Sequence, residues 1–165
     1  MTAPLLVRVD NRLVHGQVLE AWVPALEAAA LWVADDEAAG DALAQAAMEL
    51  AIPARVTLEV MTLAHAGERL RAGGGGAPER TLVLVREVAG ATALHAAGMR
   101  IPRLNLGNVH FRAGRKQVAP TLYLDASELE ALEALARAGS EVEWRAVPND
   151  SPIPLASLRA KHGQH

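Results

Sequence analysis

The sequence has 165 residues, enough for one domain with a sizeable core, and its formal net charge is −3. Nucleic acid is not an expected partner, because there is no basic surplus and only three tryptophans, one tyrosine and one phenylalanine are present to stack on bases. The chain has no cysteine, which excludes disulfides, thiolate chemistry and cysteine-ligated metal sites.

The N-terminal residues lead directly into an apolar run, residues 5–9, that is typical of a short buried strand. Neither a charged flank nor a long apolar core of a signal peptide precedes this run, and no apolar run reaches the length of a transmembrane helix. We therefore expect a cytoplasmic protein.

Strands and helices alternate through the first half of the chain. A helix is predicted for about residues 16–26, because Val18, Leu19 and Trp22 fall on one face. Asp35 and Asp36 stand where the N-cap of a later helix belongs. The other elements predicted in this half are strands at residues 29–34 and 55–60 and helices at residues 38–50 and 62–71.

The second half continues the alternation. Ser127 and Glu130 have the spacing of a capping box, which predicts a helix that begins there and ends at Gly139. The tail, residues 149–165, is predicted to hold a short helix at about residues 155–161. The other predicted elements are strands at residues 80–85, 103–106, 122–124 and 142–147 and a helix at residues 87–97.

This order of elements predicts an α/β fold, in which residues 1–165 form a single domain with an open, mostly parallel twisted sheet and helices on both faces. Functional side chains in such sheets gather beyond the C-terminal ends of the strands. That edge should hold the loop that carries His15 and the loop at residues 107–112. Two segments distant in sequence are therefore expected to meet.

His15 stands where the first strand is followed by a helix. Backbone N–H groups and the positive end of a helix dipole can bind an anion at such a point. Arg12 adds a permanent cation that can contact phosphate oxygens, and Gly16 lets a bulky group approach the backbone. These residues suit a histidine that carries a phosphoryl group, and the alternative is a histidine that only caps the helix.

Asp10 has three possible roles, to orient Arg12, to accept a hydrogen bond from the His15 ring, or to cap a turn. A structural role is favoured over a chemical one. None of the six histidines lies at metal-ligand spacing with another ligand, so neither a metal nor another cofactor is expected. His110 differs from the others because it lies on the functional edge, where it could approach the site or simply pack.

Three blocks of the sequence resemble one known family. The first, Arg8 to Val18, reads Arg-Val-Asp-Asn-Arg-Leu-Val-His-Gly-Gln-Val, and the others are residues 104–112, followed by Lys116 and Gln117, and residues 138–148. Together they resemble the IIB component of the mannose/fructose/sorbose family of the phosphoenolpyruvate-dependent sugar phosphotransferase system. The blocks span nearly the whole chain. Asn11 is a mild departure, since family members often carry a second aspartate there.

The resemblance implies that His15 is the phosphoryl acceptor and that Arg12 stabilises the phosphate. It implies no Mg²⁺, because transfer between two histidines splits no nucleotide. Six other residues of the family blocks are expected to surround this pair. They are Asp10, Gly16, Gln17, Asn105, Gly107 and His110.

The resemblance also implies partners, namely a phosphohistidine on a IIA protein as donor and a sugar bound to the membrane partners IIC and IID as acceptor. The chain would then work at the inner face of the membrane. Three cations around one aromatic ring follow the fifth strand and are expected to dock an acidic face of IIA. They are Phe111, Arg112, Arg115 and Lys116. Two alternatives stay open, a regulatory module that signals phosphotransferase status and an unrelated α/β enzyme with His15 as general base.

Overall fold

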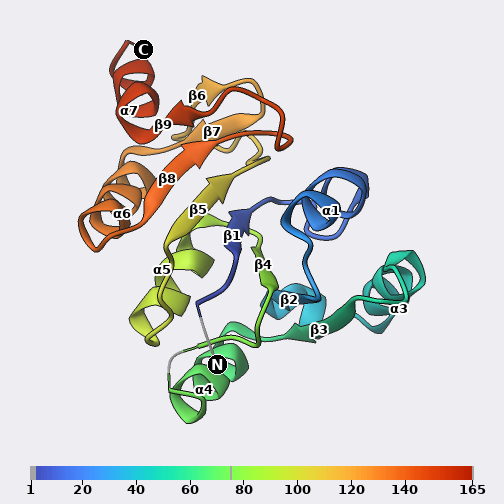
Figure 1. The fold of residues 1–165 in the computed structure, drawn as a ribbon. Helices are drawn as coiled ribbons and strands as arrows, with labels where there is room; N and C mark the ends of the chain where they lie inside the picture. The colour runs from blue at the N-terminus through green and yellow to red at the C-terminus, as the bar shows by residue number, and fades with distance from the viewer. Residues whose placement is uncertain (1–2, 75, 165) are drawn as a thin grey trace.

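The computed structural model describes residues 3–74 and 76–164, and its main element is a seven-stranded sheet (Figure 1). The strands lie in the order β3-β2-β4-β1-β5-β8-β9, and neighbouring strands are parallel except for β8 and β9. Their bounds are β1 Leu6–Val9, β2 Ala30–Ala34, β3 Thr57–Met61, β4 Thr81–Val85, β5 Arg103–Leu106, β8 Glu141–Trp144 and β9 Ile153–Pro154. The predicted fold class is confirmed.

Helices cover both faces of this sheet (Figure 1). They are η1 Val18–Trp22, α1 Val23–Leu26, α2 Asp36–Ala39, α3 Ala42–Ala51, α4 Leu63–Ala72, α5 Val88–Ala96, α6 Ala126–Arg137 and α7 Leu155–Gly163. The segment η1 is a π-helical turn, in which the N–H of Val23 bonds the carbonyl of Val18. Within the described residues, no helix is long and apolar enough to span a bilayer.

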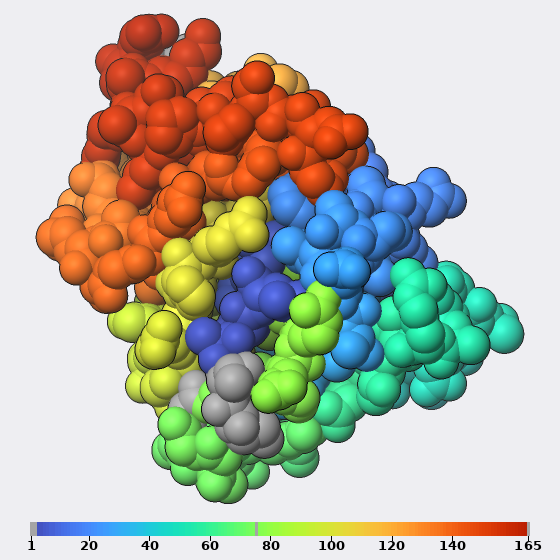
Figure 2. Space-filling view, viewed as in Figure 1, coloured from blue at the N-terminus to red at the C-terminus, as the bar shows by residue number. Residues whose placement is uncertain are grey.

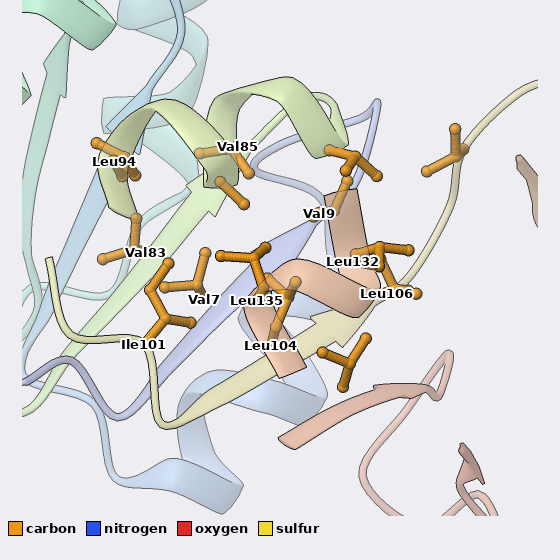
Figure 3. Close-up of a cluster of buried hydrophobic side chains, with 14 of the residues drawn as sticks. Val7, Val9, Val83, Val85, Leu94, Ile101, Leu104, Leu106, Leu132 and Leu135 are labelled. Carbon is orange, nitrogen blue, oxygen red and sulfur yellow. The ribbon is translucent and has the colours of Figure 1, made fainter. Parts of the chain in front are cut away.

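Alternation along β1 separates the two halves of the core. Val7 and Val9 face one side, where strand valines and leucines meet α5 and α6 (Figure 3). Leu6 faces the other side, with Trp22 of η1. Arg8 therefore lies on the same side as Leu6, in a core that is otherwise apolar, and it is fully buried. A buried guanidinium requires partners, and those partners form the site described below.

Three local predictions were wrong in detail. The helix predicted at residues 38–50 is broken at Gly40 and Asp41 into α2 and α3, each capped by its own aspartate, Asp35 or Asp41. The capping box of α6 is formed by Asp125 and Glu128 instead of Ser127 and Glu130, because the helix begins two residues earlier. The last long strand ends at Trp144 rather than at residue 147.

The strand predicted at residues 122–124 is confirmed as β7 Leu122–Leu124, and it lies outside the main sheet. It pairs antiparallel with β6 Lys116–Ala119, a strand that was not predicted. The short strand β9 was also missed, and its pairing with β8 gives the sheet its antiparallel edge.

Strand β1 lies between β4 and β5, so the loops that follow these three strands meet at one edge. The helix after β1 packs on one face of the sheet, and α5, which follows β4, packs on the other. A crevice between such divergent connections is where ligands and catalytic groups gather in open α/β sheets.

Candidate functional site

The loop after β1 turns sharply and then enters the helix that contains η1. Leu13 has a left-handed backbone (φ 56°), its N–H bonds the carbonyl of Asp10 at 3.1 Å, and its side chain is buried. A bulky residue in this conformation is strained, so the buried side chain and the turn hold it in place. His15 follows, and its carbonyl accepts the N–H of Leu19 at 3.0 Å, which begins the helix.

Asp10 is the centre of the site, although its side chain is fully buried. Its Oδ2 accepts hydrogen bonds from Arg8 Nη2 and from His15 Nε2, both at 3.0 Å, and its Oδ1 accepts the backbone N–H of Arg12 at 2.9 Å. The Arg12 guanidinium lies at 3.3 Å from both oxygens. Asp10 thus fills all three roles that the sequence left open.

Burial alone would raise the pKa of Asp10, but its surroundings more than reverse this effect. Hydrogen bonds from His15 and from Arg12, together with the positive charge of Arg8, hold the pKa of Asp10 well below its ordinary value. The carboxylate is therefore ionised at neutral pH and can only accept hydrogen bonds.

This charge state determines the form of the His15 ring. Because an ionised carboxylate accepts, Nε2 must carry the proton in the bond to Asp10. In the neutral ring the lone pair then lies on Nδ1, which is the nitrogen able to act as a nucleophile. The side chain of His15 is 15% exposed, so a reacting group can reach the ring. The hydrogen bond to the buried Asp10 carboxylate fixes the orientation of the ring.

Arg8 is the counter-ion behind Asp10. Its Nη1 donates to Asn105 Oδ1 at 2.5 Å and to the carbonyl of Arg145 at 3.0 Å, and its guanidinium lies 5.2 Å from the centre of the Trp22 ring. A Cβ on Gly107 would lie only 2.3 Å from Arg8 Nη2, so this position needs glycine. Asn105 and Gly107 therefore enclose Arg8, and Arg8 in turn contacts Asp10.

Arg12, in contrast, lies at the surface of the site, with 39% of its side chain exposed. Its Nη2 donates to Gln17 Oε1 at 2.7 Å, which directs the guanidinium along the start of the helix. Gly16 is exposed, and the space where its Cβ would point is open. The first helical turn therefore offers a cation and uncovered backbone beside His15.

Asn11 joins the loops after three strands. Its N–H bonds the carbonyl of Asn108 at 2.8 Å, its side-chain amide donates to the carbonyl of Arg86 at 3.0 Å, and its Oδ1 accepts the N–H of His110. His110 is thus tied to the site through its backbone. Its exposed ring lies 3.4 Å from the Asn108 side chain. This role of Asn11 was not predicted, since the residue was noted only as a departure from the family motif.

Of the four residues predicted to dock a partner, three are at least partly exposed and one is buried. Phe111 is 67% exposed and contacts Tyr123 edge-on at 5.9 Å between ring centres, and the Arg112 side chain is 59% exposed. Lys116 is half-buried at the start of β6.

Arg115 is buried, which makes the prediction that it docks a partner wrong. Its guanidinium binds Glu87 at 2.6 Å and Glu128 at 2.9 Å, and it also donates to the carbonyl of His110 at 2.9 Å. It stabilises the loop from within, and it cannot meet a partner.

No metal site is evident in the part of the chain that the structure describes, since no group of three or more histidines, aspartates or glutamates is arranged there to hold a metal ion.

Two comparisons of the sequence with known proteins agree with each other. Residues 5–165 match the family model described as PTS system sorbose subfamily IIB component. The N-acetylgalactosamine-specific phosphotransferase enzyme IIB component 2 of Escherichia coli K12 is 30% identical over 154 residues, which are 93% of this chain and 97% of the relative. The mannose-specific EIIAB component of the same organism is 30% identical over 94% of this chain, but the chain spans only 48% of that longer relative.

Solved structures give the same result. The IIBSor domain of the sorbose permease from Klebsiella pneumoniae superposes with a TM-score of 0.85 at 24% identity, over 96% of this chain and 98% of that domain. The N-acetylgalactosamine-specific IIB component 1 from Escherichia coli superposes with a TM-score of 0.80 at 31% identity, over 91% of this chain and 97% of that one.

Proposed function

Because the chain belongs to the sorbose subfamily of IIB components of the sugar phosphotransferase system, we propose that it carries a phosphoryl group on His15. The donor is a phosphohistidine on a IIA protein, and the acceptor is a sugar held by the membrane partners IIC and IID at the cytoplasmic face. The fused EIIAB relative supports a IIA donor, since its name joins the two components in one protein. The observation that carries the proposal is the bond between His15 Nε2 and a buried, ionised Asp10.

The proposed step exchanges one nitrogen–phosphorus bond for another. Nδ1 of neutral His15 attacks the phosphorus as the bond to the donor imidazole breaks, and that imidazole leaves with the electron pair. The His15 ring then carries positive charge next to the new phosphoryl group, and the Asp10 carboxylate stabilises it through the retained Nε2–H. In-line transfer of this kind depends mainly on positioning and charge stabilisation.

Arg12 and the start of the helix stabilise the phosphoryl oxygens. The Arg12 guanidinium is exposed, and its hydrogen bond to Gln17 keeps it near the start of the helix. The backbone at Gly16, at the start of the same helix, is uncovered. Both supply positive potential to a dianion, the first as a forked donor and the second through N–H groups.

Phosphorylation of the intact chain tests the proposal. With phosphoenolpyruvate, the general phosphotransferase proteins and a matching IIA, mass spectrometry should find one acid-labile phosphoryl group, on the peptide that contains His15. Two-bond ¹H–¹⁵N NMR of the labelled ring should assign it to Nδ1. A label on His110, or on Nε2 of His15, would contradict the assignment.

We propose further that Phe111 and Arg112 form part of the IIA docking surface. Both are exposed on the loop after β5, which Asn11 ties to the His15 loop. Phe111→Ala should raise the KM for phospho-IIA about tenfold while kcat changes little, because an exposed aromatic anchor acts in binding. Arg112→Glu should slow association and weaken its dependence on salt.

Steady-state transfer rates across a salt series measure both effects. The matched controls are Leu43→Ala, which removes an even more exposed apolar side chain on α3, and Arg137→Glu, which reverses an exposed charge on α6. If the controls and the loop variants behave alike, IIA docks elsewhere.

A further inference from the structure

Helix α3 carries an apolar face that nothing in the described chain covers. Leu43 is 82% exposed and Leu50 is 90% exposed, and they lie seven residues apart, two turns along one side of the helix. Ala46, Ala47 and Ala51 on the same side are also exposed. Figure 2 shows α3, in teal, projecting at the periphery of the molecule, and Figure 1 places it next to the edge strand β3.

The opposite side of α3 already packs on the body of the protein. Met48 and Ile52 lie against the core around η1 and α1, and Gln45 Nε2 donates to the carbonyls of Ala38 at 2.9 Å and Ala39 at 3.0 Å. The helix is therefore apolar on both sides, whereas a surface helix normally presents a polar face to water. A helix of this composition is usually buried on both sides, which indicates a missing partner.

We propose that this partner is a second copy of the chain, bound through α3 in an antiparallel pair about a two-fold axis. The face is symmetric about a point between Ala46 and Ala47, because Leu43 precedes the first alanine by three residues and Leu50 follows the second by three. In an antiparallel pair, Leu43 of one copy lies against Leu50 of the other at both ends. The alanines meet at the axis, where small side chains allow a close approach of the helices.

The charges at the two ends of α3 suit the same arrangement. Asp41 caps the N-terminal end, and Glu37 precedes it in α2, with 78% of its side chain exposed and its carboxylate 3.8 Å from Arg86 Nη2. Arg55 follows the C-terminal end, is exposed, and has no ion pair with any residue that the structure describes. Antiparallel pairing brings Arg55 of each copy towards Glu37 and Asp41 of the other, and it also opposes the two helix dipoles favourably.

A membrane surface fits this face poorly. Amphipathic helices that bind lipid carry lysine and arginine around the apolar stripe, whereas α3 contains neither, is preceded by Asp41 and includes Glu49. The face of one short helix is smaller than a standard interface, so we expect a reversible dimer with a dissociation constant in the micromolar range or weaker.

Sedimentation equilibrium of the full chain, from about 10 µM to about 1 mM, tests the proposal. The 17.4 kDa chain should approach twice its mass at high concentration, and Leu50→Glu should weaken the dimer at least tenfold with an unchanged circular dichroism spectrum. Glu37→Arg and Arg55→Glu should each weaken the dimer, and the two combined should restore it. This restoration requires a partner that carries the same residues, which separates a second copy from any other occupant.

Cross-linking adds a direct test, since the natural chain has no cysteine. Ala47→Cys, beside the proposed axis, should form a disulfide-linked dimer on mild oxidation, and the exposed control Arg100→Cys should not. A monomer at every concentration, or equal cross-linking of the two variants, would overturn the proposal. So would Leu50→Glu if it left the mass unchanged but abolished transfer from IIA or binding to vesicles of anionic lipid.

Discussion

Replacing His15 with alanine is expected to remove phosphoryl uptake from phospho-IIA completely. The substitution deletes the nucleophile, and the remaining imidazole at this edge, that of His110, is linked to the site through its backbone and not through its ring. The variant should fold, because the side chain it removes is partly exposed and lies in a loop. Radiolabel transfer under acid-free conditions measures the effect, and His110→Ala is the matched control, which should retain full uptake.

Replacing Arg12 instead of His15 distinguishes the role of the phosphoryl acceptor from that of the charge that stabilises it. Arg12→Ala keeps His15 and Asp10 but removes a forked cation, so uptake should reach the same final occupancy at a rate lower by about 10²–10³. Arg12→Lys should recover only part of the rate, because the fork is lost. Residual uptake in His15→Ala, or an unchanged rate in Arg12→Ala, would contradict these roles.

The fold could be predicted to the extent that its signals are local. The buried run at β4 and the amphipathic pattern of α6 depend on neighbouring residues alone, and both elements form within a residue or two of their predicted bounds. Strands β6 and β9 were missed for the opposite reason. One begins with Lys116 and Gln117 and the other has two residues, so each is a strand only because a neighbouring strand pairs with it.

The site likewise has a part that depends on neighbouring residues and a part that depends on residues distant in sequence. The motif places Asp10, Arg12 and His15 in one loop, but the counter-ion of Asp10, Arg8, comes from β1. Arg8 is in turn held by Asn105 of β5 and by the carbonyl of Arg145, which follows β8. Arg8 was overlooked because it was counted within an apolar strand. The signal was nevertheless present, since a lone charge inside a strand that is predicted to be buried must have a buried partner.

Arg115 shows the converse error. Adjacency to Phe111 and Arg112 suggested a common exposed patch, whereas the carboxylates that bind Arg115 are 28 and 13 residues away in sequence. Nothing in a single sequence relates Glu87 and Glu128 to this arginine. Charges that are clustered in sequence are therefore a weak guide to a docking surface until their partners are known.

Arg8 is the residue whose loss should destabilise the protein most. Arg8→Met keeps most of the side-chain volume but leaves the Asp10 carboxylate buried without its main counter-ion, and we expect a loss of about 3 kcal/mol in the free energy of unfolding at pH 7. Arg69→Met is the matched control. Arg69 also pairs with one carboxylate, Glu59 at 2.6 Å, and lies over a tryptophan, but both side chains are about one-third exposed, so the loss should stay below about 1 kcal/mol.

The pH dependence shows whether Arg8 acts through its charge. In the wild type the pKa of Asp10 is depressed on folding, so its contribution to stability is present above the pKa of the unfolded chain and is lost as the pH falls through the folded pKa. Arg8→Met should raise that folded pKa, because the positive charge that favours the carboxylate is gone. The stability difference between wild type and variant should therefore be largest at neutral pH. It should be smaller near about pH 3, which is below the ordinary pKa of an aspartate. Urea unfolding followed by circular dichroism at both pH values measures this, and an equal difference at the two would mean that Arg8 contributes by packing alone.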